Sequence, residues 1–238
     1  MASLGSWHTV SVTRRRRNVT MVVDSQPPVF AHSGGRFQGL DLAGQLHLGG
    51  LASFEQLGAS LGQTAGLRGC VGRLLVGGAD TLGRALASVG VAECDPCTEH
   101  TCRPGHTCLA ARTATGHTCV CPPGQCGEDT ACHAGSCGGH GVCEEAAAGA
   151  TCRCDLGWAG AECQHGRNLS RLAFSGRSHV AYPGPRHVLR RLSARLKFRA
   201  ASVRDSLLMY AAQNKDGTGD FVSLAIDDKH VEFRYLDI

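Results

Sequence analysis

Cysteine placement constrains this chain more than any other feature. The sequence has fourteen cysteines in 238 residues, and all but Cys70 lie between Cys94 and Cys163. A zinc site needs two close pairs of ligands, whereas only Cys94 and Cys97 have the C-x-x-C spacing. We therefore interpret the cysteines as disulfides, which indicates an oxidising, extracellular environment.

The cysteine-rich stretch and its flanks differ in pattern. From Cys97 to Cys163 apolar residues are too sparse for a core, so two modules of roughly 30 residues need disulfides in its place. The flanks predict strands and turns instead. The expected strands are Thr9–Thr13, Val19–Val23, Gln45–Leu48, Val71–Val76, Leu192–Phe198, Leu207–Tyr210, Phe221–Ile226 and Val231–Tyr235.

The absence of several sequence signals narrows the range of functions expected for this chain. No stretch approaches the roughly 20 apolar residues that cross a bilayer. Residues Met1–Trp7 lack the apolar region of a signal peptide, so we expect an internal piece of a longer secreted protein. The net charge of +4 argues against a general nucleic-acid binder. HExxH and GxSxG motifs are absent, so we expect no enzyme and interpret the twelve histidines as surface residues.

The second cysteine module resembles the EGF-like module. Its six cysteines end in the Gly157-Trp158-Ala-Gly160 turn that is typical of that family. The resemblance implies the pairs Cys132–Cys143, Cys137–Cys152 and Cys154–Cys163. The first module is similar but departs at Cys126, which follows Cys121 too soon; the implied pairs are Cys97–Cys108, Cys102–Cys119 and Cys121–Cys126, leaving Cys70–Cys94.

The flanks resemble opposite halves of the laminin G-like domain, a β-sandwich. The matching motifs are Gly5-Ser-Trp7-His8, Gly39-Leu-Asp41-Leu, Gly66-Leu-Arg-Gly-Cys70, Leu207-Leu-Met-Tyr210 and Lys215–Ala225. We expect a mostly β chain with a C-terminal half domain at 1–94, EGF-like modules at 95–131 and 132–164, and an N-terminal half domain at 165–238. This order resembles basement-membrane heparan sulfate proteoglycans of the agrin and perlecan type, and residues 215–225 favour the agrin type.

The laminin G resemblance implies a Ca²⁺ site with Asp41 and Asp220 as ligands, because Ca²⁺ takes hard oxygen ligands and completes its shell with carbonyls and water. Each aspartate could equally be a solvated turn residue. If the two half domains complete one another as a circularly permuted sandwich, Asp41 and Asp220 could share one ion.

Basic and modifiable residues give further candidates. Arg14, Arg15, Arg16 and Arg17 are expected at a hairpin turn, facing solvent, as a solvated turn or as a contact for a glycosaminoglycan. Asn18 and Asn168 begin N-glycosylation sequons. Thr107, just before Cys108, resembles the O-fucose acceptor of EGF-like modules.

The resemblance implies a secreted matrix protein that binds dystroglycan or heparan sulfate with Ca²⁺. The alternative is a signalling ligand or receptor ectodomain that uses its EGF-like modules for protein contacts and binds independently of Ca²⁺.

Overall fold

The computed structural model describes most of the chain. The described residues are 2–34, 38–54, 61–94, 107–110, 117–120, 132, 135–146, 149–160, 162–166, 171–185, 190–214, 216 and 218–236. Of these, the side chains of 107, 109, 110, 117–120, 145, 146, 149, 151 and 159 are outside the description. The chain divides into two compact units, Met1–Val91 with Phe174–Ile238, and Ala92–Ala173.

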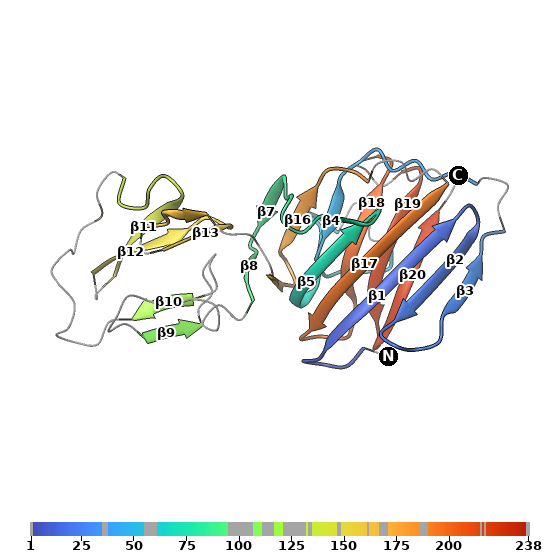
Figure 1. The fold of residues 1–238 in the computed structure, drawn as a ribbon, viewed down its shortest axis with the longest axis horizontal. Coiled ribbons are helices and arrows are strands. Elements are labelled where there is room, and N and C mark those ends of the chain that lie inside the picture. Colours follow the sequence, from blue (N-terminus) through green and yellow to red (C-terminus); the bar gives the residue numbers. More distant parts are fainter. Residues whose placement is uncertain are drawn as a thin grey trace. The chain divides into compact units, whose positions relative to one another are not determined.

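The first sheet of the first unit is built on two long strands, β1 (Trp7–Arg15) and β17 (Arg191–Ala200). They pair antiparallel along their length, from Trp7 opposite Arg199 to Arg15 opposite Arg191 (Figure 1). The sheet order is β3-β2-β1-β17-β5, followed by β15, whose residues Phe174 and Ser175 belong to this unit, and β6 pairs with β5. The other bounds are β2 (Asn18–Val23), β3 (Val29–His32), β5 (Arg68–Val76), β6 (Ala79–Asp80) and β15 (Leu172–Ser175).

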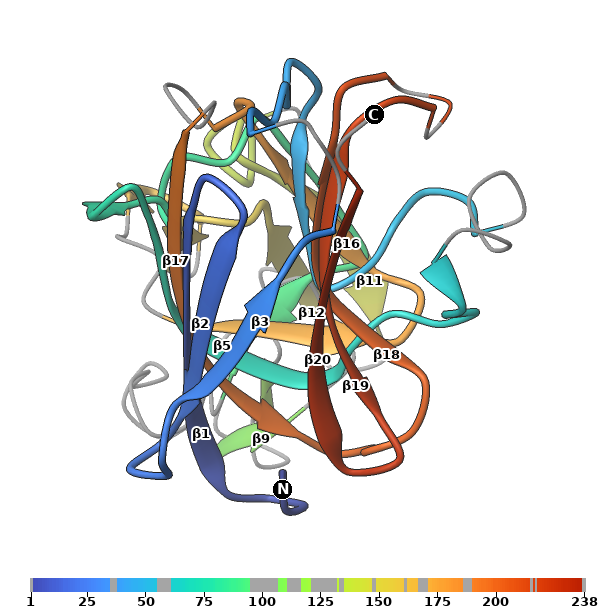
Figure 2. The same ribbon diagram turned by 90° about the vertical axis from the view of Figure 1, so that its right-hand side faces the viewer.

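The second sheet faces the first and has the order β20-β19-β18-β4-β16-β7 (Figure 2). Its strands are β4 (Leu46–Leu48), β7 (Ala87–Val89), β16 (His179–Tyr182), β18 (Ser206–Ala212), β19 (Phe221–Asp227) and β20 (His230–Leu236). Asp228 and Lys229, which form the turn between β19 and β20, both have positive φ, the conformation of a tight two-residue hairpin. The hairpins expected at 9–23 and 221–235 are confirmed.

The core lies between the two sheets. Leu192, Leu196 and Phe198 alternate with outward residues on β17 and are at most 2% exposed. This is the period-2 alternation expected of a strand that buries one face. On β16, in contrast, all four residues are buried, including Val180 and Tyr182 at 0% exposure.

The outer face of the second sheet is also covered. Leu51, Leu61, Leu207, Tyr210, Ala212 and Phe221 form a second apolar cluster, with Phe54 packed against it. The Arg234 guanidinium donates to the Leu61 carbonyl at 2.5 Å, which ties this covering segment to β20. Because both faces are covered, all of β18 is buried, which explains its continuous apolar sequence.

One sandwich thus forms from two segments that are far apart in the sequence. β17, from the C-terminal segment, lies between β1 and β5 of the N-terminal segment, while β4 of the N-terminal segment lies between β18 and β16. The hypothesis that the two half domains complete one another agrees with this pairing. Their origin in two separate domains stays a prediction.

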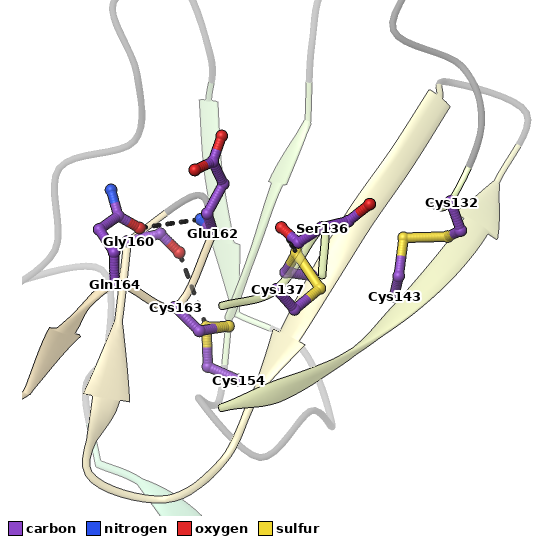
Figure 3. Close-up of a disulfide and its surroundings, with 10 residues drawn as sticks. Cys132, Ser136, Cys137, Cys143, Cys154, Gly160, Glu162, Cys163 and Gln164 are labelled. Atoms are coloured by element: carbon purple, nitrogen blue, oxygen red, sulfur yellow. Dashed lines mark hydrogen bonds between the residues drawn. A yellow bond between two sulfur atoms is a disulfide. The ribbon is translucent and has the colours of Figure 1, made fainter. Parts of the chain in front are cut away.

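The second unit is held by disulfides and small sheets. Cys132–Cys143, Cys137–Cys152 and Cys154–Cys163 are bonded, which is the pairing that the EGF-like resemblance implies (Figure 3). β8 (Ala92–Glu93) pairs with Leu172 and Ala173 at the two ends of the unit. The other strands are β9 (Thr107–Ala110), β10 (His117–Val120), β11 (Gly141–Ala146), β12 (Gly149–Cys154), β13 (Trp158–Ala159) and β14 (His165–Gly166).

Candidate functional site

Asp41 and Asp220 meet at one end of the sandwich. The Asp41 N–H donates to Oδ2 of Asp220 at 2.7 Å, although the two residues are 179 positions apart. Asp41 is exposed, whereas Asp220, the residue before β19, is only 8% exposed. The structure therefore brings together the two residues that the sequence resemblance proposed as ligands of one ion.

The strand pairing of β4 fixes this contact. Leu46 lies opposite Ala211, and the ladder continues beyond β4 with Gly44 N–H donating to the Ala212 carbonyl at 2.9 Å. A Cβ at Gly44 would lie 2.5 Å from that carbonyl oxygen, so a side chain there would break the close approach. Glycine at position 44 thus places Asp41 against the connection between β18 and β19.

Gln213 links the two aspartates. Its Nε2 lies 3.4 Å from Oδ2 of Asp41, and its Oε1 accepts the Asp220 N–H at 3.3 Å. The Gln213 N–H also donates to the Asp220 carbonyl at 2.8 Å, closing the connection. The amide side chain therefore orients both aspartates from between them.

The same connection carries a third carboxylate. Thr218 donates to Oδ1 of Asp216 from its hydroxyl at 2.7 Å and from its backbone N–H at 3.0 Å. These two hydrogen bonds hold the pKa of Asp216 below its ordinary value, so Asp216 is ionised at neutral pH. Burial, and then the charge of Asp216, raise the pKa of Tyr210 to about 12. The β18–β19 connection therefore carries a negative charge at Asp216.

The residues present suit a hard cation such as Ca²⁺. Asp41 and Asp220 supply carboxylate oxygens from two different segments, with the Gln213 amide oxygen beside them. In the part of the chain that the structure describes, no group of three or more His, Cys, Asp or Glu side chains is close enough to hold a metal. A Ca²⁺ ion takes about six to eight oxygens, so carbonyls, water or a ligand would have to supply the rest.

The arginine run lies at the same end but is not all exposed. Figure 2 shows the β1–β2 turn and the β18–β19 connection at the end opposite the β19–β20 turn. Arg15 and Arg16 are exposed and Arg17 is half-buried. The expectation that Arg14 faces solvent is wrong, because Arg14 is 0% exposed and its guanidinium carbon lies 5.2 Å from the Tyr235 ring centroid. Arg14 follows Val10 and Val12 on the inward face of β1, and Tyr235 offers it a cation–π contact.

A row of cations on the outer face of β17 was missed in the sequence analysis. Arg191, Arg195 and Lys197 are exposed, Arg199 is half-exposed, and all four alternate with core residues. Alternate residues on a strand lie about 7 Å apart, so Arg195, Lys197 and Arg199 form a continuous row, and Ser193 separates them from Arg191. The Trp7 ring lies beside it, with the Lys197 ammonium 5.5 Å and the Arg199 guanidinium carbon 5.1 Å from its centroid. The sequence did contain a pattern that predicts this row. Alternate residues of a strand point to opposite faces, and the inward residues are Leu192, Ala194, Leu196 and Phe198, so the residues between them point outward.

A hydrogen-bonded serine, histidine and aspartate at the start of the chain fasten the N-terminal segment. His8 Nδ1 lies 2.7 Å from Oδ2 of Asp24, and its Nε2 accepts the Ser3 N–H at 2.9 Å. Partial burial would raise the pKa of Asp24, but the hydrogen bonds from His8 and Thr9 outweigh it and lower that pKa. Because the Nε2 lone pair already accepts a backbone amide, this set is built to hold the segment in place and not to activate the Ser3 hydroxyl.

The remaining predicted sites have the following positions. Cys70, Cys94 and Cys108 are each disulfide-bonded, and their pairing stays a prediction. Cys97, Cys102, Cys121, Cys126 and Asn168 lie outside the described residues, as do the side chains of Cys119 and Thr107. Asn18 is exposed at the start of β2, and its Oδ1 lies 2.6 Å from Nδ1 of His32.

Comparison with known proteins finds similarity to a family model and to several larger proteins. Residues 2–79 match the laminin G domain. The chain is 39% identical over 114 residues to the basement membrane-specific heparan sulfate proteoglycan core protein of Mus musculus, covering 46% of this chain and 3% of that protein. It is 30% identical over 243 residues to pikachurin of Bos taurus, covering 98% of this chain and 20% of that protein. It is 36% identical over 114 residues to neurexin-2 of Mus musculus, covering 43% of this chain and 6% of that protein.

These matches agree with the observed fold. The chain is a mostly β protein with a laminin G-like sandwich, homologous to a basement-membrane proteoglycan core protein and to pikachurin. It spans a fifth or less of the length of these relatives. No solved structure gives a significant match. None of the helices in the described part of the chain has the length and apolar character needed to cross a bilayer.

Proposed function

We propose that this chain is part of a secreted extracellular-matrix adhesion protein that binds acidic glycans with the help of Ca²⁺. The observation that carries the proposal is the contact between Asp41 and Asp220 at one end of the sandwich. Its relatives include a basement-membrane proteoglycan core protein, which supports a role in the matrix. The glycan would be of the dystroglycan or heparan type.

Asp41 and Asp220 would hold the Ca²⁺ ion, with Gln213 orienting them. When bound, the ion would supply positive charge and open coordination positions for hydroxyl or carboxylate oxygens of the sugar. Arg15 and Arg16, exposed at the same end of the sandwich, would contact sulfate or carboxylate groups farther along the glycan. The cations of β17 offer a second, more extended surface for such groups.

The cysteine-rich unit would then act as an EGF-like spacer. The match to pikachurin runs through 98% of this chain, so it includes both sandwich segments and the cysteine-rich stretch between them. Of the two proteoglycan types that the sequence resembles, the perlecan type has support from a relative, and the agrin type remains a hypothesis.

Calcium titration of the oxidised chain by calorimetry tests the metal part of the proposal. We expect Asp41→Asn and Asp220→Asn each to weaken Ca²⁺ binding at least about tenfold, which corresponds to about 1.4 kcal/mol. The matched control is Asp228→Asn in the turn at the opposite end, where asparagine tolerates the φ of 39°. If Asp41→Asn and Asp220→Asn both bound Ca²⁺ with wild-type affinity, the shared site would be refuted.

Heparin binding with and without EDTA tests the glycan part. We expect EDTA to weaken heparin binding by the wild type. In the Asp220→Asn variant, EDTA should cause no further loss of heparin binding. Binding that survives EDTA unchanged would instead favour the alternative, a signalling ligand or receptor ectodomain that contacts a protein partner through its cysteine-rich modules.

A further inference from the structure

Two histidines face one another where the N-terminal and C-terminal segments of the sandwich join. His47 is on β4 and His179 is on the neighbouring strand β16. His47 lies opposite Ala181, two residues after His179, so both side chains are on the same face of the sheet. The ring centroids are 6.2 Å apart, and the ring planes differ by 58°.

Both rings have a buried nitrogen without a hydrogen-bond partner. Nδ1 of His47 and Nδ1 of His179 are each shielded from solvent, and neither is hydrogen-bonded. His179 is 9% exposed as a whole, while His47 is half-buried. A buried polar atom without a partner costs free energy and calls for an explanation such as a bound ion.

The chemistry of the pair suits a transition metal. Burial lowers the pKa of both histidines, and for His47 the neighbouring His179 lowers it further, so both are neutral at pH 7. Neutral imidazole is the form that ligates Zn²⁺, Cu²⁺ and Ni²⁺, and Zn²⁺ binds nitrogen at about 2.0–2.1 Å. Two imidazoles on one such ion have ring centres roughly 5–6 Å apart, which a small shift of either ring would reach.

We propose that His47 and His179 form a two-histidine site for a divalent transition metal of the Zn²⁺ class. The ion would connect β4 of the N-terminal segment to β16 of the C-terminal segment, with water completing its shell on the half-buried side of His47. It would bind only when the two segments have paired, so it would hold the assembled sandwich together. This site is separate from the aspartate pair, where the ligands are oxygens.

Zinc titration of the intact, oxidised chain tests the site. We expect one Zn²⁺ equivalent to bind and to raise the thermal unfolding midpoint. His47→Gln and His179→Gln should each weaken this binding at least about tenfold and abolish the rise in midpoint. The matched control is His230→Gln, which changes an exposed histidine at the β19–β20 turn. Excess Ca²⁺ should leave the zinc site occupied, because a nitrogen site does not favour a hard cation.

A second measurement keeps the proposal testable if a variant does not fold. In the wild type, the ring nitrogen resonances of His47 and His179 should shift together at one equivalent of Zn²⁺ in nitrogen-15 spectra. Zinc that shifts other histidines while these two stay unchanged would overturn the proposal. So would glutamine variants that fold and bind Zn²⁺ as the wild type does.

Discussion

The sandwich and the cysteine-rich unit are stabilised in different ways. The sandwich buries Phe198, Leu196 and Tyr182 at 1% exposure or less between two sheets. In the second unit, the buried cluster consists of Cys137, Cys154 and Cys163, with Trp158 and two further cysteines packed against it. Sulfur therefore takes the place that leucine and phenylalanine hold in the sandwich. One region depends on apolar burial and the other on covalent cross-links.

The two tryptophans allow this comparison to be measured. The sequence has only two, and Trp7 lies on β1 of the sandwich while Trp158 lies in the cysteine-rich unit. Trp158 stacks on His140 with ring centroids 3.3 Å apart. A Trp158→Phe background reports on the sandwich alone, and a Trp7→Phe background reports on the cysteine-rich unit.

We expect the largest effect from Phe198→Ala. Removing this fully buried ring should lower the free energy of unfolding of the sandwich by about 3–5 kcal/mol, because it leaves a cavity between the sheets. Urea unfolding followed by Trp7 fluorescence measures the loss. The control Val142→Ala changes a residue that is 54% exposed in the other unit and should cost less than about 0.5 kcal/mol. If the Trp158 signal moved as far as the Trp7 signal, the two units would not be independent.

The second largest effect should follow from removing one disulfide. A Cys154→Ser, Cys163→Ser double variant should destabilise the cysteine-rich unit by about 2–4 kcal/mol, because Cys163 is 0% exposed and its bond to Cys154 crosses the buried cluster. Trp158 fluorescence in urea measures this change. Glu144→Ala, which breaks an exposed ion pair with Arg153, is the control and should change little. A Trp7 transition that shifted with the double variant would contradict separate stabilisation.

The smallest effect should come from mild acid and should be confined to the sandwich. The pKa values of His47 and His179 are lowered by burial, so the unfolded chain binds their protons more readily than the folded chain does. Their contribution to stability is complete above the unfolded value of 6.5 and is lost as the pH falls below it. Tyr210, opposite His47 on β18, is neutral throughout this range, and Val89, opposite His179, carries no charge.

Unfolding midpoints in urea between pH 7.5 and 5 measure this loss. The His47→Gln, His179→Gln double variant should flatten the pH dependence of the Trp7 transition, whereas His230→Gln should preserve it. An unchanged slope in the double variant would show that other groups are responsible.

The alternation of apolar residues and the positions of turn residues made much of the sheet structure predictable from the sequence. The alternation of Val19, Met21 and Val23 and the turn at Asp227–Lys229 each specify a hairpin from neighbouring residues, and both hairpins are present. Sequence resemblance also placed Asp41 and Asp220 in related positions. Their meeting depends on pairing between β4 and β18, which no local pattern could reveal.

The burial of Arg14 and of the two histidines was harder to predict from the sequence. The run of four arginines concealed that Arg14 continues the inward alternation of Val10 and Val12, so its burial was missed. His47 and His179 are also far apart in the sequence and were interpreted as surface residues. Both lie on strands that are paired on each side, β4 with β16 and β18, and β16 with β4 and β7, and this pairing is a tertiary feature.

The pairing of β8 with β15 bears on how the chain folds. The two sandwich segments are separated by the whole cysteine-rich unit, and closing a long flexible loop costs conformational entropy that grows slowly with its length. Ala92 lies opposite Ala173, so the two ends of the cysteine-rich unit lie side by side. The loop that must close to bring β1 against β17 is then much shorter than the sequence suggests. Non-local strand pairing of this kind slows folding, and early formation of the β8–β15 pair would lower the barrier by reducing the effective contact order of the sandwich.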